Sequence, residues 1–180
     1  MKWGTALLFS ALASGAAQAS EQDLYIAGSI GAHEFADEKG QKYAIHVGAK
    51  NIADNAFFIG GELEFALLKN DDFEETYGGY KEDYSYSANI PVGKRFYMGS
   101  ESSIDVYGLA GYSSLRIYRG SDDATGDGFR WGAGIDGNFS DLMVGLRYTQ
   151  GKIEGALEDG TDRDDTEKNI SLIVGYKVQF

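Results

Sequence analysis

Strict alternation of apolar and polar side chains is the feature that most constrains the fold of this chain. Residues 57–67 show it most clearly, with apolar side chains or glycine at the odd positions and Glu62 and Glu64 between them. Successive side chains of a β-strand point to opposite faces of the sheet. Each segment of this kind therefore has one apolar face and one polar or mixed face, which predicts a strand and not a helix.

The same alternation recurs along the chain and predicts eight strands. They are expected at residues 24–32, 43–51, 56–68, 83–95, 103–118, 129–138, 142–152 and 167–180. The connections alternate between a longer type (33–42, 69–82, 119–128 and 153–166) and a shorter type (52–55, 96–102 and 139–141). Transmembrane barrels have an even number of strands, short periplasmic turns and longer extracellular loops. The rhythm of the connections favours this architecture.

The chemistry of the two faces indicates which one is the outside. The polar face is small and rich in glycine, whereas the apolar face carries Tyr, Phe and Trp near strand ends, as in the aromatic girdles of membrane barrels. We therefore predict an all-β fold, an eight-stranded antiparallel transmembrane β-barrel. The parity of residues 103–118 is less clear. We expect Tyr107, Leu109, Leu115 and Ile117 on the outer face and Arg116 inside, although a bulge could reverse half of the segment.

The first 19 residues have the pattern of a secretory signal peptide. Lys2 precedes a short apolar run, and residues 17–19 form an A-x-A cleavage signal. Residues 20–180 are then the barrel domain. The chain has no Cys, which excludes disulfides and Cys-ligated metals, and 28 acidic against 16 basic residues, a net charge of −12 that argues against a nucleic-acid partner.

Charged side chains on the polar face form the first candidate site. The predicted lumen set is His46, Lys50, Glu62, Glu64, Arg95, Arg116, Arg130, Asp136, Arg147 and Lys177. If the hairpin at 52–55 is symmetric about Asp54, His46 faces Glu62. The interior of an eight-stranded barrel is just wide enough for side chains to fill, so we expect these charges to pair and plug the lumen. Lining of a narrow pore is the alternative.

The last strand resembles the C-terminal signature of Gram-negative outer-membrane barrels. That signature places apolar or aromatic residues at alternate positions before a final Phe, here Tyr176, Val178 and Phe180. Residues 132–136 and 146–148 also resemble strands six and seven of the small OmpA/OmpX-like porin family. The resemblance implies location in the outer membrane, contact with membrane lipid and lipopolysaccharide, and recognition by the barrel assembly machinery. The family hosts anchors, adhesins and lipid enzymes, so it does not define the function.

The expected loops form the second candidate site. Residues 69–83 hold six acids against two lysines, and residues 158–168 hold six acids against Arg163 and Lys168. Such loops could hold divalent cations that bridge lipopolysaccharide phosphates, meet a basic partner, or serve as solvated rim. Exposed aromatics could add an adhesive surface for a host or cell-surface ligand. The candidate residues are Asp71, Asp72, Phe73, Tyr77, Tyr80, Phe129, Asp162, Asp164 and Asp165.

Enzymatic activity is not expected. Small outer-membrane barrels include lipid A-modifying enzymes built around His and Ser, but this chain has two histidines, His33 and His46, and no H-x-S pair. His33 with Glu34 and a loop Ser is the enzyme alternative. We expect a monomer without cofactor or metal, with a structural or surface-interaction role. A small porin is the second hypothesis. A soluble lipocalin-like carrier is disfavoured because the usual G-x-W motif is missing.

Overall fold

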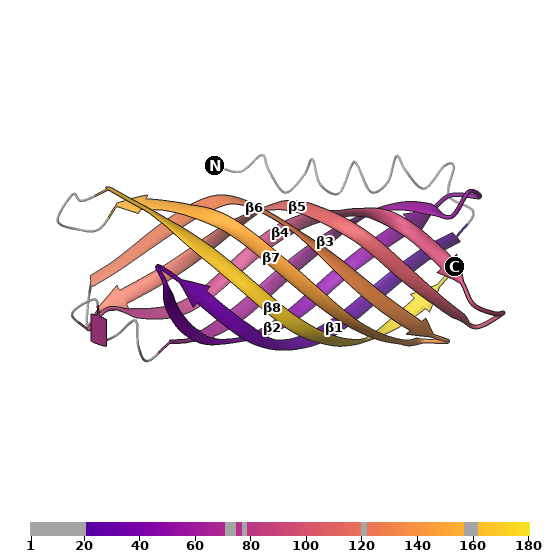
Figure 1. The fold of residues 1–180 in the computed structure, drawn as a ribbon, viewed down its shortest axis with the longest axis horizontal. Coiled ribbons are helices and arrows are strands. Elements are labelled where there is room, and N and C mark those ends of the chain that lie inside the picture. The colour runs from indigo at the N-terminus through magenta and orange to yellow at the C-terminus, as the bar shows by residue number, and fades with distance from the viewer. Residues whose placement is uncertain (1–20, 71–74, 77–78, 120–121, 157–161) are drawn as a thin grey trace.

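The computed structural model describes residues 21–180 except 71–74, 77–78, 120–121 and 157–161. The strands are β1 (Glu21–Phe35), β2 (Glu38–Ile52), β3 (Phe57–Lys69), β4 (Lys81–Tyr97), β5 (Ser102–Arg119), β6 (Asp122–Phe139), β7 (Leu142–Ala156) and β8 (Asp162–Gln179). Each strand pairs antiparallel with its neighbours in the chain, and β8 pairs with β1 to close an eight-stranded barrel (Figure 1). The predicted all-β architecture is confirmed. The candidate signal peptide lies outside the described residues.

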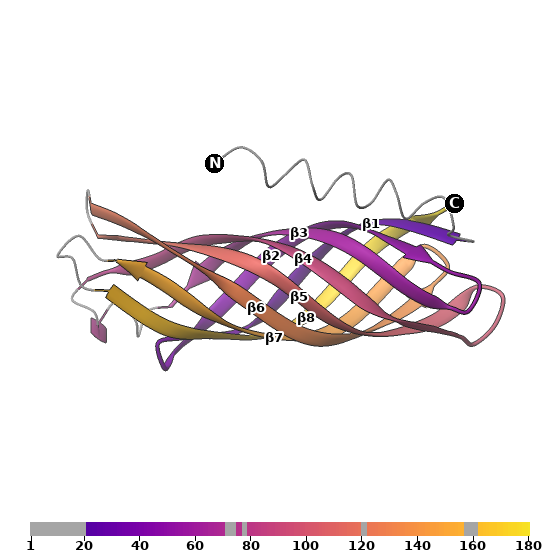
Figure 2. The ribbon, with the colours of Figure 1, turned by 90° about the horizontal axis from the view of Figure 1, so that it is seen from above.

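The barrel is elongated, and its two ends differ (Figures 1 and 2). The C-terminus and the start of β1 lie at one end, where Gln22 and Phe180 exchange two backbone hydrogen bonds. The short connections 53–56, 98–101 and 140–141 lie at this end, which we call the turn end. The opposite end, which we call the loop end, is formed by the last residues of β1, β3, β5 and β7 and the first residues of β2, β4, β6 and β8. Within the described residues, no helix is long and apolar enough to cross a membrane.

Strands extend further at the loop end than the sequence pattern predicted. β1 and β2 continue to a tight turn at Ala36 and Asp37, both with positive φ (53° and 67°), so the expected loop 33–42 is mostly strand. The expected loop 119–128 is likewise mostly part of β6. Hydrogen-bond ladders continue where the side-chain pattern becomes polar on both faces, which is why alternation alone underestimated the length of these strands.

The β2–β3 hairpin has a different register from the expected one. Its pairs, such as Ile52 with Phe58, are symmetric about Asn55 and not about Asp54. His46 is therefore opposite Glu64, and Glu62 is opposite Gly48. The turn tolerates the shift because Ala56 adopts φ 66°. The expected facing of His46 and Glu62 across the ladder is therefore wrong by two residues.

The inner and outer faces predicted from the alternation are confirmed on every strand except β5. On β5 the expected parity is reversed: Tyr107, Leu109 and Leu115 are buried inside, and Arg116 points outward, with its guanidinium 5.6 Å from the Tyr84 ring. The ladder explains the reversal, because Asp105 pairs with Arg95 on β4 and with Asp136 on β6, both inward residues. Arg116 is thus not a lumen residue. The irregular pairing lies in β4, between Glu82 and Ser85.

The outer wall of the barrel is an apolar band. Alternate residues of β1, β2, β3, β7 and β8, such as Ile26, Ile45, Leu63, Leu146 and Leu172, are each roughly half exposed although they are aliphatic. A soluble protein would bury such side chains, and a patch that encircles the molecule far exceeds the exposed apolar area of a soluble monomer. The wall is built to face hydrocarbon.

Candidate functional site

Buried charged side chains fill the interior between the turn end and an apolar layer at the loop end. Nine of the ten predicted lumen residues are there: His46, Lys50, Glu62, Glu64, Arg95, Arg130, Asp136, Arg147 and Lys177. The structure adds members that the sequence reasoning missed: Asp23, His33, Lys42, Glu82, Asp105 and Glu167. They point inward from alternate positions of their strands, except that Glu82 lies beyond the irregular pairing in β4 and has the opposite parity to the other inward residues of that strand. The interior is thus a continuous ion-pair network that runs from the turn end toward the loop end.

Arg95 and Lys50 organise the layer at the turn end. Arg95 donates to Asp105 Oδ1 (2.8 Å), to Asp23 Oδ2 (2.6 Å) and to Glu21. The Lys50 ammonium donates to Asp105 Oδ2 and Asp136 Oδ2, both at 2.9 Å. Arg95 and Lys177 also line a polar pocket of about 140 Å³ at this end. Every charge in this layer has an opposite partner, as a buried charge requires.

Three aromatic rings surround the Lys50 ammonium. The ring centres of Tyr25, Phe58 and Tyr107 lie 5.6, 5.1 and 5.3 Å from Lys50 Nζ. Cations at such distances are attracted by the negative faces of aromatic rings. The three rings thereby pack around the ammonium inside the barrel.

Glu62 and Arg147 form the centre of the network. Arg147 Nη1 and Nη2 donate to Glu62 Oε1 and Oε2 at 2.6 and 2.9 Å, a bidentate pair. Tyr25 donates to Glu62 Oε2 (2.9 Å), and Tyr107 donates to Asp136 Oδ1 (3.0 Å) while accepting from Arg147. The Tyr107 hydroxyl therefore connects the central pair to the layer at the turn end, whereas Tyr25 reaches that layer through its ring beside Lys50.

Glu64 anchors the next layer. Its Oε1 accepts from Lys42 Nζ at 2.6 Å and from Arg130 Nη1 at 2.9 Å. Arg130 also donates to Ser87 and Thr149 (2.8 and 2.9 Å). Above it, at the loop end, His33 lies between Asn169 Oδ1 (2.8 Å) and Glu82 Oε1 (2.7 Å).

Apolar side chains close the interior at the loop end. Phe35, Leu68, Leu115 and Ile153 form one buried cluster, and each is at most 8% exposed. They come from β1, β3, β5 and β7, so alternate strands supply one layer of the interior. Tyr80 and Ile117 pack against this cluster. We call Phe35, Leu68, Leu115 and Ile153 the apolar seal, because they cover the polar network beneath them with hydrocarbon.

Two glycines on the inner face make room for the buried tyrosines. Tyr25 lies across the ladder from Gly48, and Tyr107 from Gly134. A Cβ at either glycine would lie 2.5 Å from the ring of its partner, closer than real contacts allow. The tyrosine rings can thus lie flat over the neighbouring strand and reach the central charges.

His46, Glu62 and Glu64 have ligand atoms within 4.8 Å of one another, a spacing at which three ligands can hold a metal ion. Both oxygens of Glu62 accept from Arg147, and Glu64 accepts from Lys42 and Arg130. These cations already neutralise the carboxylates and would repel a divalent ion. The donor set does not fit a metal. His46 instead bonds to Ser29 Oγ through Nε2 (2.8 Å), with Nδ1 3.4 Å from Glu62 Oε1.

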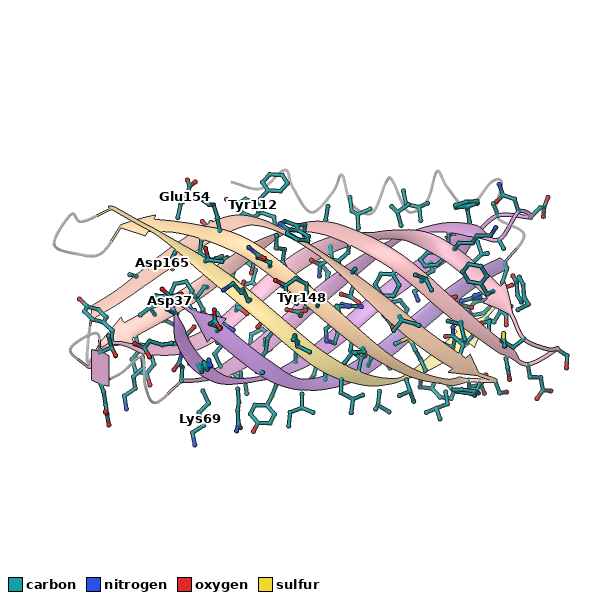
Figure 3. The ribbon with its side chains drawn as sticks, viewed as in Figure 1. Asp37, Lys69, Tyr112, Tyr148, Glu154 and Asp165 are labelled. Carbon is teal, nitrogen blue, oxygen red and sulfur yellow. The ribbon has the colours of Figure 1, made fainter. Side chains whose placement is uncertain are left out.

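The structure places the expected loop residues unevenly. Asp71, Asp72, Phe73 and Tyr77 lie outside the described residues, as do the side chains of Asp162 and Asp164 in β8. Asp165 is a half-buried residue of β8, and Tyr80 packs on the apolar seal instead of lying free on the rim. Phe129 is 75% exposed on the outer wall, edge-on to Tyr112 with ring centres 5.9 Å apart. Figure 3 shows Tyr112 on the same wall.

The enzyme alternative required His33 and Glu34 to work together. His33 points into the barrel and is 1% exposed, whereas Glu34 points outward and accepts from Lys168 (2.6 Å). The two side chains therefore lie on opposite faces of β1. They do not form a catalytic pair.

The inner residues that sequence reasoning missed were hidden by conservative strand boundaries. Asp23 and His33 lie at the ends of β1, Lys42 and Glu82 lie on strand residues that were assigned to loops, and Asp105 lies on the strand with reversed parity. Extending each period-two pattern by one residue would have found Asp23, His33 and Lys42. Glu82 needed the irregular pairing between Glu82 and Ser85, which turns it inward against the parity of the rest of β4. Asp105 needed the register of its neighbours.

Tyr176, Val178 and Phe180 all lie on the outer wall at the end of the chain. They are 55%, 42% and 72% exposed, at alternate positions of β8 and just beyond it. The side chain of Lys177 between them points inward to Asp23. The C-terminal pattern is therefore displayed on one face, next to β1.

Comparisons with known proteins agree with this geometry. Residues 4–177 match the family model described as outer membrane protein beta-barrel domain. Neisserial surface protein A superposes with a TM-score of 0.57 at 10% identity, over 86% of this chain and 96% of that one. Ail, the attachment invasion locus protein of Yersinia pestis, gives a TM-score of 0.50 at 12% identity, over 89% and 99%. No curated protein matches this sequence. The chain belongs to the outer membrane protein β-barrel domain family.

Proposed function

We propose that this protein is a non-enzymatic outer-membrane barrel that does not conduct and acts through the surface at its loop end. The observation that carries the proposal is the filled interior. Three layers of paired charges, centred on Arg95, Arg147 and Arg130, are covered by the apolar seal. A water-filled channel needs a polar path along its whole length, and four packed hydrocarbon side chains interrupt it. The function is therefore carried by the exposed surface at the loop end and not by the interior.

Charge at the loop end supports a role in surface interaction. The connection between β3 and β4 and the one between β7 and β8 belong to the two acidic segments of the sequence, 69–83 and 158–168, of which Glu82 and Glu167 point into the barrel and do not contribute to the surface. In this family the loop end faces out of the cell and the termini face the periplasm. Acidic loops on that side would meet a basic partner or divalent cations at the cell surface.

Planar-bilayer recording tests the closed interior. We expect the purified, folded protein to give no discrete conductance steps. Folding is verified beforehand by heat-modifiable migration on SDS gels, because a closed barrel has no free edge from which to open. Steps that change size in Glu62→Ala or Arg147→Ala would overturn the proposal and make the protein a small porin, the runner-up hypothesis.

Loop replacement tests the surface role. Residues 71–78 are replaced by a short Gly/Ser linker in one variant, and the turn 53–56 is replaced in a control at the other end. We expect both variants to assemble into folded barrels, and we expect loss of adhesion to cells or of binding to surface ligands in the loop variant alone. Equal behaviour of the two variants would remove the loop end from the function.

Absence of lipid A chemistry is tested directly. Cells that express the protein and cells that express His33→Gln should yield lipid A of the same mass. A difference in lipid A mass between them would support an enzyme and contradict the proposal.

The C-terminal residues are proposed as the assembly signal. Tyr176, Val178 and Phe180 present alternate side chains outward on the strand that closes the barrel. Phe180→Ala should lower the amount of folded protein in outer membranes while leaving refolding of the purified protein in detergent unchanged. Equal loss in both assays would mean that Phe180 acts on stability and not on recognition.

A further inference from the structure

The polar pocket of about 140 Å³ lies at the turn end, at the opposite end of the barrel from the surface on which the proposed function depends. Its walls come from the start of β1, the ends of β4 and β8, and the turns that join β4 to β5 and β6 to β7 (Figure 1). These two turns are tied together, because the Ser140 amide donates to the Glu101 carbonyl oxygen at 2.7 Å. The pocket is therefore enclosed by the tied turns on one side and by the mouth of the barrel on the other.

The ammonium of Lys177 lines this pocket and is poorly satisfied. Lys177 is 5% exposed, and among the described residues its ammonium contacts the carboxylate of Asp23, at 3.4 and 3.5 Å from the two oxygens. Hydrogen bonds of this kind are ordinarily about 2.7–3.2 Å long. Arg95 engages Asp23 more closely, at 2.6 Å. Because an ammonium has several donors, a buried cation with spare donor capacity borders the pocket.

A second buried polar group is incompletely bonded beside the pocket. Asn138 is 2% exposed, and its Oδ1 has no hydrogen-bond partner among the described residues. Its Nδ2 donates to Ser103 Oγ at 3.3 Å, and Ser103 lines the pocket. Most buried polar groups in proteins are hydrogen-bonded. Ser103 accepts in this contact, so its own hydroxyl proton is available to a ligand beside Lys177.

Carboxylates of the two turns form the exposed side of the pocket. Glu101 and Asp141 are both exposed, and neither has a basic partner among the described residues. Asp141 accepts from the Tyr176 hydroxyl through Oδ2 at 3.2 Å, which leaves Oδ1 for another donor. Glu21 in the same wall is different, because it accepts from Arg95 and Tyr97. The exposed side of the pocket thus favours a cation, whereas the buried side favours an anion.

We propose that the pocket binds a small zwitterion of the α-amino acid type, with its carboxylate on the Lys177 ammonium and its ammonium against Glu101 and Asp141. A lone anion meets the repulsion of the two carboxylates, and a lone cation meets the repulsion of the buried ammonium. A ligand that carries both charges satisfies both sides. A cavity of about 150 Å³ holds a molecule of the size of benzene, and an amino acid with a short side chain is comparably small.

The site goes beyond the proposed function and does not depend on it. The termini of barrels in this family face the periplasm, so the ligand enters from that compartment and not from the cell surface. The network beneath the pocket closes it toward the lumen, because Arg95 and Lys50 are held by Asp105 at 2.8 and 2.9 Å. The pocket is therefore a binding site and not the entrance of a channel.

The test is an NMR titration of the full, folded protein in neutral detergent with alanine at constant ionic strength. Ethylamine and propionate are the matched probes, because each is alanine without one of its two charged groups. We expect the amide signals of Ser103 and Ser140 to shift and saturate at millimolar alanine, since a ligand of this size makes few contacts. Each matched probe should bind about tenfold more weakly, because a hydrogen bond to a charged group contributes on that order.

Two variants test the two sides of the pocket. Lys177→Met and Asp141→Asn should each weaken alanine binding about tenfold for the same reason. Their matched controls are Lys94→Met, on the outer face of β4, and Asp54→Asn, in the turn between β2 and β3 at the same end. Both controls lie outside the pocket and should bind within about twofold of the parent, as expected of independent sites. Heat-modifiable migration verifies that all four variants are folded.

Four results would overturn the proposal. Equal binding of propionate and alanine would mean an anion site on Lys177 alone, and equal binding of ethylamine and alanine would mean a cation site on the turns alone. The other two are the absence of saturable shifts with alanine and equal affinity of the pocket variants and their controls. The titration measures neither conductance nor the loops, so its failure is distinguishable from failure of the proposed function.

Discussion

Glu62 on β3 and Arg147 on β7 join opposite walls of the barrel through two hydrogen bonds of 2.6 and 2.9 Å. These strands are four apart in a closed sheet of eight, so the pair spans the lumen and is not a contact between neighbours. Tyr25, Tyr107 and Asn89 add hydrogen bonds to the same two side chains. The pair is therefore the cross-brace on which the central layer of the network depends.

Removal of one partner of this pair should strongly destabilise the barrel. Glu62→Gln leaves the Arg147 guanidinium buried without its counter-charge, and breaking a buried pair in this way costs about 3–5 kcal/mol. The measurement is the free energy of unfolding by urea in lipid vesicles. Glu154→Gln, an exposed carboxylate on the outer wall, is the control and should change stability by less than about 0.5 kcal/mol. Equal effects of the two variants would show that the central pair contributes no special stability.

Truncation of the apolar seal should also be costly. Leu115 is 0% exposed in the cluster with Phe35, Leu68 and Ile153, so Leu115→Ala leaves a cavity and should lower the free energy of unfolding by about 2–5 kcal/mol. Leu63→Ala, on the lipid-facing wall and 48% exposed, is the matched control. Its loss should be clearly smaller because lipid fills the vacated space. If Leu63→Ala costs as much as Leu115→Ala, the seal is not a packed layer.

Glycine at position 134 is required by the ring of Tyr107. A Cβ there would lie 2.5 Å from Cζ and from the hydroxyl oxygen of Tyr107, whereas a Cβ at Gly108, on the outer face, would come no closer than 3.7 Å to its nearest neighbour. Gly134→Ala should displace Tyr107 and with it the hydrogen bonds to Asp136 and Arg147. We expect a loss of about 1–3 kcal/mol, the usual cost of overpacking, while Gly108→Ala should be close to neutral. Thermal unfolding of the two variants side by side decides the point.

The pair between Glu34 and Lys168 should be visible in the titration of its carboxyl group. Both side chains lie on the outer wall at the loop end, beyond the apolar band, and the hydrogen bond from Lys168 lowers the pKa of Glu34 below its ordinary value. A carboxyl group with a lowered pKa stabilises the folded state above its ordinary pKa, and this contribution is lost as pH falls through the lowered value. Lys168→Gln should raise the pKa of Glu34 toward its ordinary value. The measurement is carbon NMR of the labelled side chain, and an unchanged pKa in the variant would show that the pair does not persist in solution.

Alternation by itself determined which side chains of seven strands face inward. A strand with aliphatic residues at every second position, such as residues 57–67, has one polar face and one apolar face. Turning any one of its side chains to the other face would turn all of them, and the aliphatic side chains would then point into the polar interior. The closed eight-stranded architecture followed from the number of such segments. The candidate lumen charges were predicted from the same alternation, because in these strands the charged residues occupy the positions between the apolar ones.

Tertiary structure decided two features that the alternation along a single strand left ambiguous, namely the faces of β5 and the partners of the charged residues in the lumen. In β5 both faces carry apolar residues, and the side on which Tyr107 and Leu115 lie was set by the ladder that joins Asp105 to Arg95 and Asp136. The partner of Glu62 was likewise decided by closure of the barrel, which brings Arg147 across the lumen from 85 residues away. Side-chain direction is a property of one strand, whereas pairing across a lumen depends on the register of all eight. Sequence determines the first by itself, and only the closed sheet determines the second.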